Sequence, residues 1–261
     1  MADPRLQSWW RLFHAGGPTL FELAGQALSS TERGYDLLAE KFDVTPFRTP
    51  DPLIESALAI LGEVDDALDV CCGTGAAIPH LRARCRRSVV GIDFSAGMLA
   101  EARRRTQSAP GHAHVHLVRA DARYLPFAEN FSLAVCFGGL GHFVGADQDF
   151  LVASVARSLR PAGRFAFISS TQPPIHSSRF WLAHGFNAAM RIRNALVRPP
   201  FVMDYLTFLL PEVKDLLSRH GFSVEVKQLA GRLVLVIGTL KAEVARIDRS
   251  GLNRQVKMQS R

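Results

Sequence analysis

The stretch ALDVCCGTGA, residues 67–76, joins an apolar run to an acid, two cysteines and a Gly-Thr-Gly turn. It fits a strand that feeds a nucleotide-type loop, a metal or redox site, or only a tight turn. The spacing of the four cysteines, Cys71, Cys72, Cys85 and Cys136, matches neither a zinc site nor a disulfide framework, so we expect reduced thiols and no metal. Glycines directly after a strand let the backbone approach a ligand closely, which favours the loop.

Strand-like and helix-like patterns alternate beyond this stretch. The strand-like runs are residues 66–71, 88–93, 114–120, 131–137 and 164–170, with helical patterns such as 96–105 and 147–159 between most of them. This alternation predicts βαβ units and a parallel sheet. A helix over 211–220 is followed by two strand-like runs that meet at Ala230-Gly231, which predicts an antiparallel hairpin at the end of the sheet.

The rest of the chain divides around this core. Residues 1–50 are expected to form a helical cap, with a capping box at Ser29 to Glu32. Thr49-Pro50 is expected to start a helix that ends at Gly62. We therefore predict a helical cap over 1–50, a main domain over 51–240 with a lid insertion over 171–210, and a basic tail over 241–261.

Composition limits the function classes. Hydrophobic residues make up 48% of the chain and charged residues 21%, as in ordinary globular proteins. No apolar run reaches the roughly 18 residues of a membrane-spanning helix, and the first residues lack a secretory pattern, so we expect a cytoplasmic protein without stable membrane insertion. The net charge of +7 is dispersed and not interleaved with aromatic residues, so we expect no nucleic-acid partner.

Acidic residues near the strand ends indicate the cofactor. Asp93 ends the second strand-like run, where an acid can accept hydrogen bonds from ribose hydroxyls, and Asp121 follows the third. A dinucleotide loop would carry a third glycine where this chain has Ile78. Asp69, just before the loop, would repel a pyrophosphate but would favour a cation, so the electrostatics favour S-adenosylmethionine, which has a sulfonium and an ammonium group.

Five motifs in order carry a resemblance: DVCCGTG from Asp69, VVGIDFSAGMLAEA from Val89, RADARYLPF from Arg119, FSLAVCF from Phe131 and LRPAGRF from Leu159. The chain resembles the class I S-adenosylmethionine-dependent methyltransferases, and within them the small-molecule branch that includes ubiquinone/menaquinone-biosynthesis enzymes. The resemblance covers residues 35–170, and the closing hairpin extends it to about 240. It implies an α/β fold with a Rossmann-like, seven-stranded, mostly parallel sheet, an antiparallel last strand and helices on both faces.

The resemblance also implies cofactor-binding residues. These would be Asp69, Cys71, Gly73, Thr74, Gly75, Asp93, Phe94, Met98, Asp121, Ala122, Phe137 and Gly138. Alternatives stay open for some of them: Asp121 also fits a turn former, and Phe94 and Met98 also fit core packing.

Methyl transfer from a sulfonium is a direct displacement, so the enzyme mainly aligns the acceptor and removes water from it. His142, just past the fourth strand, is the candidate general base if the acceptor must lose a proton, and it also fits a loop histidine with no catalytic role. The candidate substrate-binding residues are Tyr35, His142, His176, Trp181 and Tyr205. The aromatic content of 171–210 favours an apolar or aromatic small-molecule acceptor.

Two other functions remain open at this level. One is a methyltransferase that acts on a protein or nucleic acid, and the other is a cofactor-binding member without activity. Trp9, Trp10, Leu12 and Phe13 are expected to dock on the methyltransferase domain rather than insert into a bilayer. The sequence makes no prediction of the oligomeric state.

Overall fold

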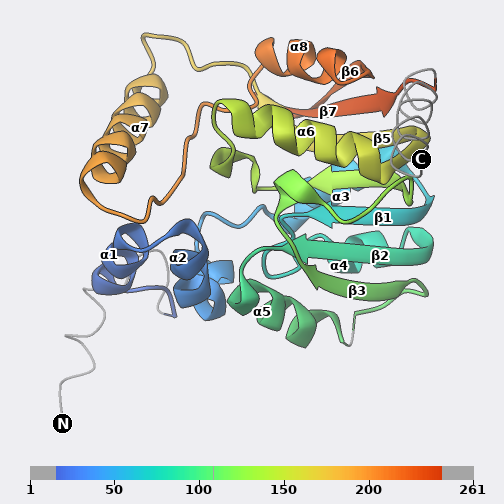
Figure 1. The fold of residues 1–261 in the computed structure, drawn as a ribbon, viewed down its shortest axis with the longest axis horizontal. Helices are drawn as coiled ribbons and strands as arrows, with labels where there is room; N and C mark the ends of the chain where they lie inside the picture. Colours follow the sequence, from blue (N-terminus) through green and yellow to red (C-terminus); the bar gives the residue numbers. More distant parts are fainter. Residues whose placement is uncertain (1–15, 108, 243–261) are drawn as a thin grey trace, which may run out of the picture.

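A computed structural model describes residues 16–107 and 109–242 (Figure 1). Its centre is a seven-stranded sheet with the strand order β3-β2-β1-β4-β5-β7-β6. The strands are β1 (Val64–Val70), β2 (Cys85–Asp93), β3 (His114–Arg119), β4 (Phe131–Cys136), β5 (Leu159–Ser170), β6 (Phe222–Ala230) and β7 (Leu233–Leu240). β1 to β5 are parallel, and β7 runs antiparallel to both β5 and β6. The predicted fold class and the predicted final hairpin are confirmed.

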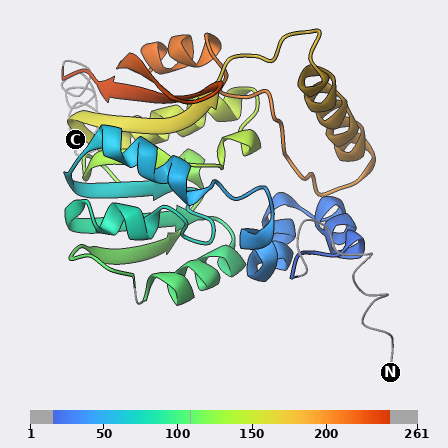
Figure 2. The same ribbon diagram turned by 180° about the vertical axis from the view of Figure 1, so that it is seen from behind.

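Helices cover both faces of the sheet (Figures 1 and 2). α3 (Asp51–Leu61), α4 (Ile78–Arg82) and α5 (Ala96–Thr106) lie over one face, where Leu58, Leu81 and Leu99 join an apolar core with Leu133 of the sheet. α6 (Ala146–Ser158) and α8 (Glu212–Arg219) lie over the other face, which is centred on the fully buried Phe165 and Phe167. β4 and β7 are buried on both faces, which explains why their sequences are almost continuously apolar.

The register of the sheet brings the loops after β1, β2 and β4 to one edge. Asp69 is paired with Gly91 of β2 on one side and with Val135 of β4 on the other. Because these three strands are parallel, their carboxyl ends meet at the same edge. The strand order reverses between β1 and β4, and ligands of open α/β sheets bind at such a switch point.

The remaining helices gather at this edge. They are α1 (Leu20–Leu28), α2 (Thr31–Leu38), α7 (Ser178–Leu196) and three short 3₁₀ helices: η1 (Ala39–Val44), η2 (Ala122–Tyr124) and η3 (Leu140–His142). Both views show α7 standing away from the sheet, on the side where α1 and α2 lie (Figures 1 and 2). A hydrogen bond from Arg193 to the carbonyl of Ser29 ties the end of α7 to the end of α1.

Two predicted helix starts differ in detail from the structure. The complete capping box lies at Thr19 and Glu22, whereas Ser30 caps α2 by accepting from the Arg33 N–H without a reciprocal acid. Thr49 does not cap α3: Pro50 holds the N-cap position, because the Thr49 hydroxyl donates instead to the carbonyl of Phe137. A tertiary contact has replaced a local one.

Within residues 16–107 and 109–242, no helix combines the length and apolar character needed to cross a bilayer. Trp9, Trp10, Leu12 and Phe13 lie outside the described residues, so their predicted docking stays a prediction.

Candidate active site

The loop after β1 has a left-handed backbone at three positions. Cys71 has φ 55°, Gly73 φ 54° and Gly75 φ 81°. A Cβ at Gly75 would lie 3.2 Å from the Cβ of Ala102, so this glycine lets the loop pack closely on α5. Cys71 adopts a conformation that side chains other than glycine rarely take, which costs about 1 kcal/mol. The segment after β1 is therefore both a tight turn and a loop of the kind that binds a ligand, so these two interpretations of the sequence describe the same feature.

Asp93 at the end of β2 is fixed by the backbone. One carboxylate oxygen accepts from the Gly73 N–H at 2.9 Å, and the other accepts from the Ser95 N–H at 2.9 Å. Its side chain is buried, and burial raises the pKa of Asp93 to about 6, although the N–H groups of Ser95 and Gly73 oppose that rise. A carboxylate in this position links the loops after β1 and β2.

Asp69, near the end of β1, is a buried acid with an oxygen atom that the described residues leave unsatisfied. It is only 2% exposed, and its Oδ2 atom has no hydrogen-bond partner among residues 16–107 and 109–242. Burial, together with the charge of Asp93, raises the pKa of Asp69 to about 8. A buried carboxylate without a partner is costly, so this group is stabilised by any cation that reaches it.

A cavity of about 360 Å³ opens above these loops. Eleven of the predicted site residues line it: Tyr35, Cys71, Gly73, Thr74, Asp93, Phe94, Met98, Phe137, Gly138, His142 and Tyr205. They come from the N-terminal helices, the loops after β1, β2 and β4, and the segment after α7. The topology has therefore brought together residues from five separate parts of the sequence.

The other predicted residues lie outside this lining. Asp69 belongs to the end of β1 and Gly75 to the loop that follows it, both outside the cavity lining, and Ala122 is buried. Asp121 accepts from both the backbone and the guanidinium of Arg123, as a turn former would, and it lines a separate surface hollow beside Phe94. His176 and Trp181 are exposed, and they lie apart from the cavity because the outer side of α7 and the segment before it face away from it.

His142 and Tyr35 form a defined pair in the cavity wall. The Nδ1 atom of His142 lies 2.7 Å from the carbonyl oxygen of Val202, which can only accept, so Nδ1 carries the proton. In the neutral ring, Nε2 is then an acceptor, and it receives the Tyr35 hydroxyl at 2.8 Å. Burial lowers the pKa of His142 and raises the pKa of Tyr35, so both groups are neutral near pH 7.

Sequence reasoning missed the segment between α2 and α3 as part of the site. Phe42, Pro46, Phe47, Arg48 and Thr49 all line the cavity. The only local signal was the Thr49-Pro50 pair, which predicts a helix start and not a ligand contact. These residues reach the cavity because η1 and the turn after it fold back over the loop after β1.

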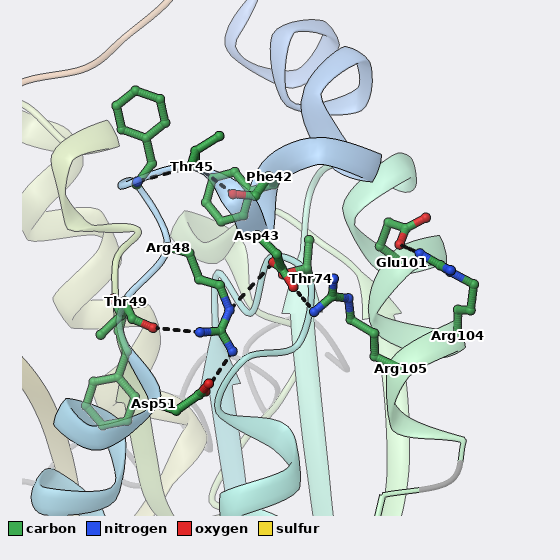
Figure 3. A network of polar contacts seen from close by, with 12 residues as sticks. Phe42, Asp43, Thr45, Arg48, Thr49, Asp51, Thr74, Glu101, Arg104 and Arg105 are labelled. Carbon is green, nitrogen blue, oxygen red and sulfur yellow. Dashed lines mark hydrogen bonds and ion pairs between the residues drawn. The ribbon is translucent and has the colours of Figure 1, made fainter. Parts of the chain in front are cut away.

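A polar network holds this segment on the loop (Figure 3). Asp43 accepts from the Thr74 hydroxyl and forms an ion pair with Arg105 of α5. Arg48 lies beside it, with Nε 3.6 Å from a carboxylate oxygen of Asp43, and donates to Asp51 at 2.7 Å. One acid thus connects the N-terminal segment, the loop after β1 and α5.

Arg48 combines burial with an unused donor. Its side chain is 18% exposed, and within the described part of the chain its Nε makes no hydrogen bond. Arg48 also lines the cavity, so its guanidinium, held in place by Asp43 and Asp51, borders the space in which an anionic group can bind.

A second cavity of about 240 Å³ adjoins the first. The two share Gly138, His142, Met203 and Tyr205. Ile168, Phe208, Leu209 and Leu233 extend the second cavity toward the end of β5, together with the hydroxyls of Ser170 and Thr207. His142, and with it the Tyr35–His142 pair, therefore stands at the junction of the two cavities.

Comparison with known proteins shows which protein family the sequence is similar to. A sequence profile described as a methyltransferase domain matches residues 67–163. A demethylmenaquinone methyltransferase of Staphylococcus aureus is 33% identical over 178 residues, which cover 63% of this chain and 71% of that protein. A demethylmenaquinone methyltransferase of Lactobacillus johnsonii is 31% identical over 112 residues, but the match spans only 45% of its length and 42% of this chain.

Solved structures share the fold at lower identity. The DhpI–SAH complex superimposes with a TM-score of 0.60 and 19% identity, covering 85% of this chain and 99% of that one. An O-methyltransferase family protein from Burkholderia thailandensis superimposes with a TM-score of 0.61 and 16% identity, covering 91% of this chain and 69% of that one. At these identities the likeness extends to the fold alone.

Proposed function

The chain belongs to the class I S-adenosylmethionine-dependent methyltransferases, and from this premise we propose that it methylates a small apolar or aromatic molecule beside the Tyr35–His142 pair. S-adenosylmethionine, when bound, supplies an electrophilic methyl group on a sulfonium. The observation that carries the proposal is that one cavity joins Asp93 and the glycine loop after β1 to a neutral His–Tyr pair.

The residues in and behind the first cavity fit this cofactor. The methionine end of S-adenosylmethionine carries an ammonium and a carboxylate on one carbon. Asp69, whose Oδ2 makes no hydrogen bond within the described residues, lies behind the cavity wall and complements the ammonium once it is ionised, and the Arg48 guanidinium in the lining complements the carboxylate. Asp93, whose orientation is fixed by two N–H groups, is then the acceptor for the ribose hydroxyls. An adenine contact of Asp121 remains a prediction.

His142 and Tyr35 handle the proton of the acceptor. The tautomer set by Val202 leaves His142 Nε2 as a base, and the Tyr35 hydroxyl already donates to it. An acceptor hydroxyl placed against Tyr35 gives its proton to the Tyr35 oxygen, while Tyr35 passes its own proton to Nε2. The Val202 carbonyl raises the pKa of His142 and so stabilises the imidazolium that results. Loss of this proton leaves more electron density on the acceptor oxygen, which makes the nucleophilic atom of the acceptor more reactive toward the methyl group.

The adjoining cavity supports an apolar ring as the acceptor. Its walls combine the apolar side chains of Ile168, Met203, Phe208 and Leu233 with the hydroxyls of Ser170 and Thr207, so they fit an apolar ring that carries a hydroxyl. The curated relatives are named for demethylmenaquinone, so a quinol ring is the first acceptor to test. The segment 171–210 delivers Met203 and Tyr205 to the junction, in keeping with its proposed role as a lid. A cytoplasmic protein without a nucleic-acid partner remains part of the same proposal.

Calorimetric titration with S-adenosylhomocysteine tests the cofactor part. We expect saturable binding by the full chain, weakened in Asp93→Asn and in Arg48→Met by about 1–3 kcal/mol each, the usual loss for a charged hydrogen bond. Arg86→Met is the matched control, because Arg86 is 68% exposed and lies far from the cavity lining. Unchanged affinity in Asp93→Asn and Arg48→Met would contradict these roles.

Transfer of a labelled methyl group tests the acceptor part. Naphthoquinols of increasing side-chain length are offered beside a peptide mixture and an RNA mixture. Labelling of the quinols alone supports the proposal. Labelling of peptide or RNA alone would replace it with the macromolecular alternative.

A further inference from the structure

The outward side of α7 is apolar along its whole length. Trp181, Leu182, Ile192 and Leu196 are 63%, 75%, 62% and 80% exposed. Between them, the small residues Gly185, Ala188 and Ala189 are exposed as well. With 3.6 residues per turn, these seven positions fall on one side of the helix, and we call them the α7 outer stripe.

The inward side of α7 combines apolar and amide side chains: Met190 is buried, and Phe186 packs against Tyr205. Asn187 is buried, donates to the carboxylate of Asp204 and accepts from the Tyr205 N–H. Asn194 exchanges two hydrogen bonds with the backbone of Phe201. A surface helix normally buries its apolar residues, whereas α7 buries only some of them, is held also by amide hydrogen bonds, and leaves the outer stripe exposed. An exposed apolar stripe of this extent marks an interaction surface.

The charge of α7 indicates the kind of partner. α7 contains Arg179, Arg191 and Arg193 and no acidic residue, and Arg198 follows its end. Arginines beside an apolar stripe with a tryptophan are typical of helices that lie in the interface of an anionic bilayer. Arg193 is held by the carbonyls of Ser29 and Pro199, so it is the long side chains of the other arginines, Arg179 and Arg198 above all, that can reach phosphate groups while the stripe contacts acyl chains.

A second copy of the chain fits this surface less well. Pairing two outer stripes about a two-fold axis would bring the arginines of both copies together, and α7 has no acidic residue to compensate them. The phosphate groups of an anionic lipid surface, in contrast, supply the negative charge that the residues of α7 lack.

We propose that the α7 outer stripe docks on the surface of an anionic lipid bilayer, with α7 lying in the plane of the interface. Both views place α7 at the periphery of the molecule, where a planar surface can reach it (Figures 1 and 2). Residues that directly follow α7 line both cavities, so the docked protein would take its acceptor from the lipid phase. This last step rests on the proposed function, whereas the docking does not.

Co-sedimentation of the full chain with vesicles tests the docking. Phosphatidylcholine vesicles are compared with vesicles of equal parts phosphatidylcholine and phosphatidylglycerol, at physiological and at high salt. We expect binding to the anionic vesicles that weakens with salt and falls at least about tenfold in the double variant Leu182→Glu/Ile192→Glu. Ile60→Glu is the matched control, because Ile60 is 40% exposed on α3 and should leave binding unchanged.

Calorimetry with S-adenosylhomocysteine accompanies each variant. Equal affinity in all of them shows that the fold is intact, and it keeps a failure of docking distinct from a failure of the proposed function. The docking proposal is overturned if the wild type ignores anionic vesicles or if the double variant binds them as well as the wild type does. It is also overturned if light scattering shows a lipid-free dimer that the double variant abolishes, since the stripe would then be covered by a second copy.

Discussion

The hydroxyl of Tyr35 lies 2.8 Å from Nε2 of His142, although 107 positions separate the two residues in the sequence. Tyr35 belongs to α2 and His142 to the 3₁₀ turn after β4, and Phe201 stacks on Tyr35 from the segment after α7. Three separate parts of the chain therefore fix one hydrogen bond. The orientation of the proposed base depends on all of them.

Replacing His142 with Gln should lower the rate of methyl transfer by a factor of about 10²–10⁴, the usual contribution of a general base. Tyr35→Phe should lower it as well, because the proton path through the hydroxyl is lost. Affinity for S-adenosylhomocysteine should stay within about twofold of wild type. Single-turnover assays of both variants, with His184→Gln on the outer part of α7 as the control, check this expectation.

The pH dependence of that rate follows from the lowered pKa of His142. Because burial disfavours the imidazolium, the base stays neutral below the ordinary histidine pKa of 6.5. The single-turnover rate should therefore hold from pH 7.5 through pH 6.5 and decline only in more acidic buffer. A decline centred above pH 7 would point to a different ionising group.

Binding of S-adenosylhomocysteine should strengthen as the pH rises from 6 toward 8. The raised pKa of Asp69, about 8, keeps this acid protonated in the free protein, and the ligand ammonium favours its ionised form. Binding below pH 8 should therefore release a proton, which calorimetry in buffers of different ionisation enthalpy detects. Asp69→Asn should bind more weakly and without this proton. Retention of the full pH effect in Asp69→Asn would assign it to another group.

The stability of the unliganded protein should fall over the same range. Asp69 is protonated up to about pH 8 in the folded state but only to about pH 4 when unfolded, so the folded state binds the extra proton between these values. Stability is then highest at the acidic end, and this residue removes up to about 1.4 kcal/mol per pH unit as the pH rises. Urea unfolding of Asp69→Asn should show a flatter profile between pH 5 and 8. If the free energy of unfolding changed with pH equally steeply in the wild type and in Asp69→Asn, the assignment of this effect to Asp69 would be wrong.

Replacing Asp43 with Asn should loosen the N-terminal segment from the cofactor loop. Asp43 is 13% exposed and pairs with Arg105 and Thr74, so the variant leaves charged donors without their acceptor and should cost about 1–3 kcal/mol. Glu101→Gln is the control in the same region (Figure 3), since its partner Arg104 is 69% exposed and such pairs contribute about 0–1 kcal/mol. Urea unfolding and S-adenosylhomocysteine titration measure the two effects. If both variants lost the same free energy of unfolding, Asp43 would contribute no more to stability than the exposed Glu101–Arg104 pair does.

The sequence by itself determined the sheet and its loop. Alternating apolar strands and helices, with glycines and acids at the strand ends, suffice for this because they act locally or between neighbouring strands. Asp93 and Gly73 meet wherever β1 and β2 pair in parallel, since each follows its own strand directly. The cofactor loop was therefore readable from residue order alone.

Tertiary structure decided the contacts made by segments without a periodic signal. Arg48 enters the cavity only because Asp43 anchors its segment on Thr74, and the tautomer of His142 is set by the distant carbonyl of Val202. Trp181 was predicted to bind the acceptor, but it faces outward. The side of α7 that carries Asn187 and Asn194 is the one attached to the rest of the protein. Such long-range hydrogen bonds join groups whose sequence separation carries no pattern. Only the folded backbone could show which partner each of them meets.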